Sequence, residues 1–403
     1  MAPLRCVRFV KNLRRIVVLG CGFYKMPLGV FRRWWLIPNG MNFLLLHEFH
    51  QGLNAQFTEV NGEEVVAQYG DWLAEHAAIR EAAGVLDLSF RGRLCLLGAD
   101  RQSFLNGQVT NNVKDLKTGQ GCYAALIAAK GKMQADLNIY ILENEILLDF
   151  EPGLSETVKQ RLEKYIIADD VQIVDVAPDY GLLSVQGPKS NEVVNSLQLD
   201  FVLPARAMNF SSVKNETLGE IYLSNHPRVG NTGFDLFIPT ISLGAVADKL
   251  IAAAQRIGGR ACGWKAFDTA RIEAGIPRFG TDMDETNLPP EAGLDSRAVS
   301  YTKGCYIGQE VIARIRTYGQ VAKALRGLRL ADDLKSLPRK GDKLYLGEKE
   351  IGYITSAIAS PAFKANIALG YVRREGNKIG TDLVLRNHDG ESAVKIVDLP
   401  FRG

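Results

Sequence analysis

The last part of the chain constrains its fold most strongly, because it consists of short apolar segments separated by turns. Turn-forming pairs such as Gly347-Glu348 and Asp389-Gly390 divide these segments at close intervals. Short alternating segments at this spacing are typical of a small antiparallel barrel. We therefore expect an all-β barrel domain over residues 319–403. Its six strand-like segments are 325–330, 343–346, 351–358, 366–373, 383–386 and 393–399.

The preceding residues, 45–318, mix helix-like and strand-like segments, a pattern that favours α+β architecture over a single doubly wound sheet. Residues 71–83 and 243–257 have the apolar spacing of helices, whereas 122–142 has the pattern of a hairpin. With 403 residues, 46% of them apolar, the chain is long enough to bury the cores of two or three domains. We expect two α+β domains ahead of the barrel.

Charge and cysteine spacing exclude several classes of protein. The net charge is only +3, and the body of the chain has no long basic run, so the sequence does not require nucleic-acid binding. The six cysteines are irregularly spaced and form no CxxC pair, which argues against a zinc ribbon, an iron–sulfur cradle or a disulfide framework. His47 and His50 lack the HExxH spacing of zinc proteases. We expect a reducing compartment and no bound metal.

Residues 1–40 differ from the rest, with eight basic residues and no acidic one. Such a start is typical of an organellar transit peptide, but the absence of serine weakens that interpretation. It could equally be a translated upstream region, with Met41 as the first residue of the functional protein. Its apolar stretches are too short to span a bilayer, so no membrane partner is expected. We exclude residues 1–40 from the fold and predict a cytoplasmic protein, or alternatively a mitochondrial matrix or plastid one.

Residues 303–314, KGCYIGQEVIAR, contain a cysteine between two glycines, followed by a helix-like run. A helix starting after Gly308 would point its free N–H groups back toward Cys305, and its partial positive charge would favour a thiolate. Lys303 would act in the same direction. The alternative is a glycine-punctuated loop with a buried, inert cysteine. Glu310 and Arg314 have the spacing of an i, i+4 ion pair.

Acidic residues at two other places in the sequence are candidates for a functional site. Asp136 interrupts an apolar strand-like segment, so its carboxyl lies either on a solvent-exposed face or in a site. Asp282, Asp284 and Glu285 could bind a hard cation, but the segment lacks the glycine and the final acid of an EF-hand. We expect the latter three to form a solvated loop.

The segment 303–314 closely resembles the signature of the YgfZ-type folate-binding proteins. These are relatives of the T-protein (aminomethyltransferase) of the glycine cleavage system and of the mitochondrial factor that matures iron–sulfur proteins. The resemblance covers roughly residues 45–403. It includes NGQVTNNV (106–113), AAKGKMQADL (128–137) and the segment 270–294. T-proteins proper are similar in the surrounding framework but lack KGCYIGQE.

This resemblance implies a three-domain ring around a central opening that receives tetrahydrofolate. It implies an accessory protein that supports iron–sulfur cluster assembly or repair, and thereby cluster-dependent enzymes such as those that modify tRNA. The partners it implies are iron–sulfur proteins or their assembly machinery, with Cys305 as the reactive residue. The other positions that match the family motif are Lys303, Gly304, Tyr306, Gly308, Gln309, Glu310 and Arg314.

The alternative function is that of an aminomethyltransferase, which moves a one-carbon unit to tetrahydrofolate. By resemblance, Asp136 matches the second of two paired acids in T-proteins and would polarise the folate amine or its water. Asn111 and Arg271 lie in the matching segments and are expected folate contacts. Asn231 takes the place of a glutamate that holds the pterin ring in T-proteins, and an amide lacks that charge. This departure argues against a true aminomethyltransferase, while the enzyme question stays open.

Overall fold

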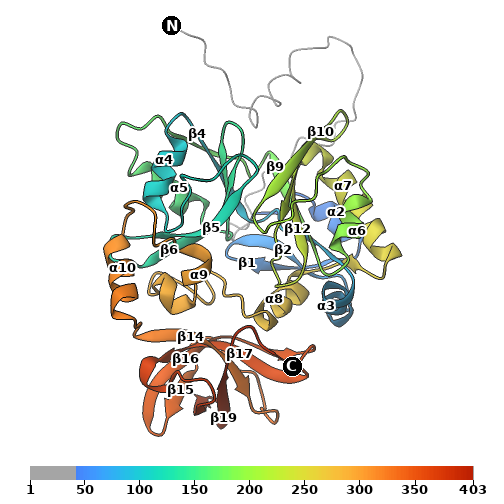
Figure 1. The fold of residues 1–403 in the computed structure, drawn as a ribbon. Coiled ribbons are helices and arrows are strands. Elements are labelled where there is room, and N and C mark those ends of the chain that lie inside the picture. Colours follow the sequence, from blue (N-terminus) through green and yellow to red (C-terminus); the bar gives the residue numbers. More distant parts are fainter. Residues whose placement is uncertain (1–41, 403) are drawn as a thin grey trace.

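The computed structural model describes residues 42–402, drawn in colour in Figure 1. The predictions for residues 1–40 lie outside this range, and the cellular location stays a prediction. No helix within residues 42–402 is both long and apolar enough to cross a membrane. Residues 42–402 form two large sheets, a two-stranded hairpin and a closed barrel.

The first large sheet has five antiparallel strands in the order β5-β6-β7-β4-β8. Alternate residues of β6 point to opposite faces, as in any strand. Ala135, Leu137 and Ile139 face a core that the helices α4 and α5 cover, which leaves Asp136 on the other face. The elements are β4 (Gly92–Leu97), α4 (Arg101–Gln108), β5 (Gly121–Ile127), β6 (Met133–Ile141), β7 (Ile146–Phe150), α5 (Ser155–Glu163) and β8 (Gln172–Asp175).

The second large sheet has six strands in the order β10-β11-β12-β9-β3-β13. Helix α7 packs on it through Leu243, Val246 and Leu250, which share one helical face. The chain enters this sheet at β3, leaves to build the first sheet, and returns at β9. The elements are β3 (Gly84–Asp87), β9 (Tyr180–Gln186), α6 (Ser190–Asn195), β10 (Phe210–Asn215), β11 (Gly219–Asn225), β12 (Gly233–Pro239), α7 (Thr240–Arg256) and β13 (Arg260–Ala261).

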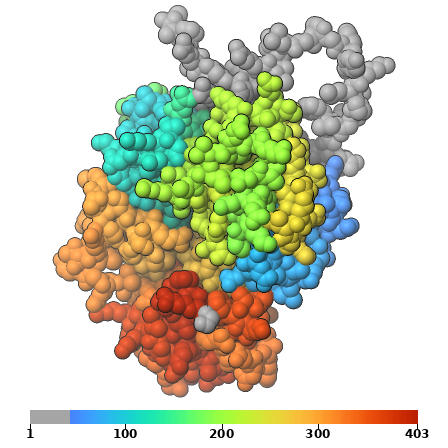
Figure 2. All heavy atoms as spheres, turned by 45° about the vertical axis from the view of Figure 1, so that its right-hand side comes forward, coloured from blue at the N-terminus to red at the C-terminus, as the bar shows by residue number. Residues whose placement is uncertain are grey.

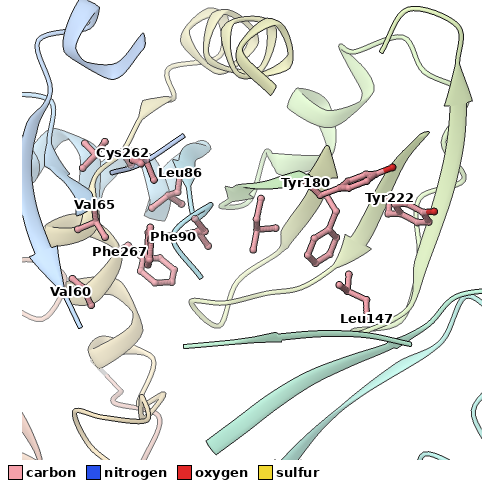
Figure 3. Close-up of a cluster of buried hydrophobic side chains, with 14 of the residues drawn as sticks. Val60, Val65, Leu86, Phe90, Leu147, Tyr180, Tyr222, Cys262 and Phe267 are labelled. Carbon is pink, nitrogen blue, oxygen red and sulfur yellow. The ribbon is translucent and has the colours of Figure 1, made fainter. Parts of the chain in front are cut away.

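A shared core joins the two sheets (Figure 3). Leu147 of the first sheet, Tyr180 of the second and Phe267 of helix α8 belong to one buried cluster. A hairpin that we did not predict from the sequence contributes Val60 and Val65 to the same cluster. The elements around it are α2 (His47–Gly52), β1 (Gln56–Val60), β2 (Glu63–Gln68), α3 (Trp72–Glu81) and α8 (Trp264–Glu273).

The C-terminal strands close into a barrel in the order β14-β17-β16-β15-β18-β19. The predicted α+β fold with a small C-terminal barrel is therefore confirmed. Figure 2 shows the barrel, in red, as a lobe packed against the rest of the protein. Its strands are β14 (Lys323–Leu330), β15 (Lys343–Leu346), β16 (Lys349–Ser360), β17 (Ala365–Arg373), β18 (Asp382–Asn387) and β19 (Gly390–Val397).

Buried polar contacts hold the barrel to helix α8. Glu273 accepts hydrogen bonds from His76 of α3 at 2.8 Å and from Ser360 of the barrel at 2.5 Å. Asp282 pairs with Arg271 and accepts hydrogen bonds from the hydroxyls of two residues of β16, at 2.6 and 2.7 Å. Because these partners come from three parts of the chain, the barrel has a defined orientation against the sheets.

Candidate functional site

A cavity of about 400 Å³ lies between the two sheets and the segment that follows α8. Strands β5 and β6 form one wall, and the loop between β11 and β12 forms another. Its lining is rich in arginine and in polar groups, which suits a polar ligand with anionic or hydrogen-bonding groups. The main polar residues are Arg91, Asn111, Asp136, Asn138, Glu151, His226, Arg228, Arg271, Arg278 and Arg297.

Asp136 lines this cavity and has one carboxylate oxygen without a hydrogen-bond partner among residues 42–402. Its Oδ2 accepts a hydrogen bond from the Tyr123 hydroxyl at 2.8 Å, whereas Oδ1 is buried and has no partner within residues 42–402. Burial, with the nearby charge of Glu151, raises the pKa of Asp136 to about 6. A carboxyl group with this pKa can both take up and release a proton near neutral pH.

A network of buried ion pairs lies beside Asp136. Asp149 contacts the Arg91 guanidinium at 2.7 Å and the Arg228 guanidinium at 2.8 Å. Arg228 also contacts Asp235 at 2.7 Å, and Arg91 contacts Glu151 at 2.5 Å. Burial alone would raise the pKa of Asp149, but the two arginines outweigh it and hold that pKa well below its usual range. This network is satisfied internally and fixes the floor of the cavity.

Asn111 and Arg297 also line the cavity. The Asn111 amide donates to the carbonyl oxygen of Tyr123 at 2.9 Å and to that of Arg297 at 3.4 Å. The exposed guanidinium of Arg297 lies 5.5 Å from the ring centroid of Tyr123. Asn111 thus shares the cavity with Asp136, and its role in folate binding stays a prediction.

The structure places the other two predicted folate residues differently. Arg271 lines the cavity, but its guanidinium is occupied by Asp268 at 2.8 Å, by Asp282 and by Ser356 at 3.2 Å. Its position thus serves the attachment of the barrel. Asn231 lies in the turn before β12, outside the cavity lining. Contacts of either residue with folate stay predictions.

The helix expected after Gly308 is present, and Cys305 is not the buried residue of the alternative interpretation. Helix α10 (Gln309–Tyr318) begins after Gly308, so Cys305 lies four residues before its first residue. The Cys305 side chain is exposed. The Lys303 ammonium donates to the carbonyl oxygens of Asn106, Val109 and Asn111 at 2.5, 2.8 and 2.7 Å. Burial lowers the pKa of Lys303 to about 8.

The remaining motif residues anchor this segment. Gly308 has a φ of +82°, and a Cβ there would approach the Ala128 carbonyl oxygen within 2.5 Å, so both the conformation and the contact require glycine. Tyr306 is buried, whereas Gly304 is exposed. No ion pair joins Glu310 to Arg314 in the described structure, in contrast to the sequence expectation; both side chains are exposed. Gln309 is the first residue of helix α10.

The acidic loop after α8 is only partly the solvated loop that we expected. Asp282 is fully buried and paired with Arg271, because it attaches the barrel. Asp284 accepts hydrogen bonds from the backbone and hydroxyl of Thr286, at 2.8 and 2.6 Å. Within residues 42–402, no group of three or more potential ligands could hold a metal ion.

Sequence reasoning missed several residues of the cavity, namely Arg91, Asn138, Glu151, His226 and Arg228. They come from four separate segments, and no local motif connects them. One signal was available: Asp149 and Asp235 interrupt apolar strands and therefore need buried cationic partners. The sequence does not reveal which arginines supply them.

Known proteins resemble this chain over almost its whole described length. The family model of the GCVT N-terminal domain matches residues 46–303, and that of the glycine cleavage T-protein C-terminal barrel domain matches residues 323–402. The aminomethyltransferase of Symbiobacterium thermophilum is 30% identical over 368 residues, which cover 88% of this chain and 96% of that protein. The aminomethyltransferase of Saccharopolyspora erythraea is 31% identical over 366 residues, with the same coverage of 88% and 96%.

A solved structure shares the fold. The crystal structure of the glycine cleavage system aminomethyltransferase T from Bartonella henselae superposes with a TM-score of 0.81 at 24% sequence identity. The match covers 90% of this chain and 98% of that chain. This likeness agrees with the arrangement of two α+β parts and a barrel described above.

These findings correct the function expected from the Cys305 segment. The expected principal role in iron–sulfur cluster assembly is wrong, since the relatives matched over most of the chain are named aminomethyltransferases. None of these names supports iron–sulfur proteins as partners. The comparisons favour the alternative, an aminomethyltransferase, despite the asparagine at position 231. Matches to both family models over residues 46–303 and 323–402 establish that the chain belongs to the glycine cleavage T-protein family.

Proposed function

We propose that this protein binds tetrahydrofolate in the central cavity and transfers to it the methylene group of an aminomethyl group held on a carrier thiol. The observation that carries the proposal is the carboxyl group of Asp136 in the cavity lining, with one oxygen held by Tyr123 and the other buried and without a hydrogen-bond partner among residues 42–402. The names of the matched relatives support the same reaction class.

The chemistry requires proton transfers at a folate amine. The carrier S–CH₂–NH₂ group and tetrahydrofolate yield methylenetetrahydrofolate, ammonia and the free thiol. New bonds join the carbon to N5 and N10, while its bonds to sulfur and to the amino nitrogen break. The protons of N5 and N10 end on the ammonia and on the thiol. Asp136, with a pKa of about 6, is suited to take a proton from the amine and release it to a leaving group.

The arginine-rich lining supports binding of folate, whose glutamate part carries carboxylates. Arg297 is exposed at the cavity and has no ion-pair partner within the described chain, so it is available to an anionic group. Arg91 and Arg228, in contrast, already form ion pairs with buried carboxylates. We infer that the folate tail lies toward Arg297 and that the pterin ring lies between Asp136 and His226.

The test is turnover with an aminomethyl-lipoyl carrier protein and tetrahydrofolate, followed by release of ammonia and formation of methylenetetrahydrofolate. The isosteric Asp136→Asn variant should lower the rate by about 10²–10⁴-fold, because it removes the proton acceptor. An Asp382→Asn variant, altered at an exposed position of the barrel, is the control and should keep full activity. Absence of turnover by the unaltered protein would refute the proposal.

The narrower resemblance, to the YgfZ-type branch of the family, rests on the segment around Cys305. We infer that this segment distinguishes the chain from T-proteins proper, because Cys305 is exposed while Lys303 and Gly308 anchor the loop. Turnover that survives Cys305→Ala would mean that the thiol plays no part in the transfer.

A further inference from the structure

Lys303 is a buried cation whose hydrogen-bond partners are all backbone carbonyl oxygens. The residue is only 8% exposed. Its ammonium group donates to the carbonyl oxygens of Asn106, Val109 and Asn111 at 2.5, 2.8 and 2.7 Å. An ammonium group has three N–H donors, so each donor has one acceptor. No carboxylate pairs with Lys303 within residues 42–402, and its charge therefore serves to hold the backbone of residues 106–111.

The backbone of residues 109–111 connects strand β5 with a later part of the chain. The Thr110 N–H donates to the carbonyl oxygen of Ala125 in that strand at 3.0 Å. Three further hydrogen bonds join the same stretch to the segment 297–300. They run from the Thr110 hydroxyl to the Ala298 carbonyl oxygen at 2.6 Å, from the Ser300 N–H to the Thr110 carbonyl oxygen at 3.0 Å, and from the Asn111 amide to the Arg297 carbonyl oxygen at 3.4 Å.

Arg297 lies on a short helix that these hydrogen bonds hold in place. Helix α9 (Asp295–Ala298) has only four residues and therefore little stability of its own. The Arg297 side chain is exposed, lines the cavity and lies 5.5 Å from the ring centroid of Tyr123. The hydrogen bonds from residues 110 and 111 therefore help to fix the backbone from which the guanidinium extends.

We propose that Lys303 is a positioning residue, which fixes the cavity-lining Arg297 through the backbone of residues 109–111. The inference rests on the proposed function, in which the anionic tail of tetrahydrofolate lies toward Arg297. Loss of the Lys303 ammonium leaves three carbonyl oxygens without their donor and loosens the stretch that joins β5 to Arg297. Tyr123 and Asp136 lie on the paired strands β5 and β6, so they keep their places. We therefore expect weaker binding of the ligand's carboxylates and little change at Asp136.

Binding of two ligands to Lys303→Met gives the first test, because methionine has a similar length but no donor. Calorimetric titration should show that the Kd for tetrahydrofolate rises about 3- to 10-fold, the loss expected from one weakened polar contact. The Kd for 6-methyltetrahydropterin, which has the ring but no carboxylate, should stay within about twofold when it is measured by competition. Partial unfolding would instead lower the number of binding sites and leave both Kd values unchanged. An unchanged Kd for tetrahydrofolate, or equal losses for both ligands, would overturn the inference.

A double-mutant cycle tests whether Lys303 acts through Arg297. Arg297→Met removes the proposed carboxylate contact and should by itself raise the Kd for tetrahydrofolate. Added to Arg297→Met, Lys303→Met should raise the Kd by less than about twofold, since the contact that it positions is already absent. Effects that multiply would refute the assignment. Arg326→Met is the matched control and should leave the Kd unchanged, because Arg326 also donates to a backbone carbonyl oxygen, that of Asn377 at 2.9 Å, but lies in the barrel strand β14.

Hydrogen exchange of the unaltered protein decides the question if Lys303→Met fails to fold. Tetrahydrofolate should slow the exchange of backbone N–H groups in the segments 106–111 and 297–300 together, because hydrogen bonds join the two segments. Binding of 6-methyltetrahydropterin should not slow it. Unchanged exchange in either segment on binding of tetrahydrofolate would overturn the inference but leave the proposed function intact. Absence of tetrahydrofolate binding would overturn both.

Discussion

The cavity wall around Asp136 and the charged cluster around Asp149 contain the same side chain on neighbouring strands, yet the two carboxyl groups behave in opposite ways. Asp149 is held by two arginines, which keep its pKa well below its usual range. Asp136 has one tyrosine partner and one buried oxygen without a hydrogen-bond partner among residues 42–402, and burial raises its pKa to about 6. Burial makes the charge of each costly, and the supply of cationic partners decides which carboxyl remains available for chemistry.

We expect the largest change in unfolding free energy from substitution of Asp149, the carboxylate that is fully paired. Asp149→Asn removes the shared anion from Arg91 and Arg228 and leaves two buried cations with less compensation. Breaking a buried pair of this kind costs roughly 3–5 kcal/mol of unfolding free energy. Urea unfolding followed by circular dichroism would measure it. The control Asp382→Asn, where the carboxyl is 82% exposed, should change stability by less than about 0.5 kcal/mol. A loss below about 1 kcal/mol in Asp149→Asn would contradict the interpretation of this cluster.

Substitution of Asp136, in contrast, should increase the unfolding free energy at neutral pH. The pKa of Asp136 is about 6 in the folded protein, above the ordinary value of 3.8, so the folded state binds the proton more tightly than the unfolded chain does. Its favourable contribution is fully present below pH 3.8 and is lost as pH rises through about 6. Asp136→Asn cannot ionise and should therefore be more stable than the unaltered protein at pH 7, by about 1–3 kcal/mol.

The pH dependence of unfolding checks this prediction. The stability difference between Asp136→Asn and the unaltered protein should shrink toward zero as the pH falls from 7 to about 4. A difference that is constant across this range would mean that ionisation of Asp136 does not oppose folding. Greater stability in a variant with impaired turnover would identify Asp136 as a residue retained for activity.

We expect the smallest change in unfolding free energy from substitution of Cys305, whose thiol is exposed. Cys305→Ser changes a side chain on the surface and should alter the unfolding free energy by less than about 0.5 kcal/mol. Lys303→Met, two residues earlier, removes three hydrogen bonds to carbonyl oxygens and should cost about 2–3 kcal/mol. Thermal unfolding of the two variants side by side would show whether Lys303 stabilises the fold while Cys305 contributes little to stability. Similar losses in both would contradict that view.

Local patterns in the sequence predicted the elements that local physics controls. The C-terminal barrel follows from strand-length segments separated by turns, and the hairpin of β5 and β6 follows from two apolar segments around Gly131. The hairpin of β1 and β2 was missed, because Glu63 and Glu64 interrupt its apolar pattern. Family resemblance, rather than spacing, placed Asp136 in a site. The short segment around Cys305 predicted a role in iron–sulfur cluster assembly, which the relatives matched over most of the chain contradict.

The sequence by itself determined that this chain builds α+β layers followed by a small barrel, since the periods of 3.6 and 2 residues are local properties. Only the tertiary structure decided which aspartate is paired with arginines and which has an oxygen without a partner. Arg91 and Arg228 are separated by more than one hundred residues, and they meet at Asp149 because the chain leaves the second sheet at β3 and returns to it at β9. Asp136 Oδ1 has no arginine partner within residues 42–402. The candidate site depends on this contrast between the paired Asp149 and the unpaired oxygen of Asp136.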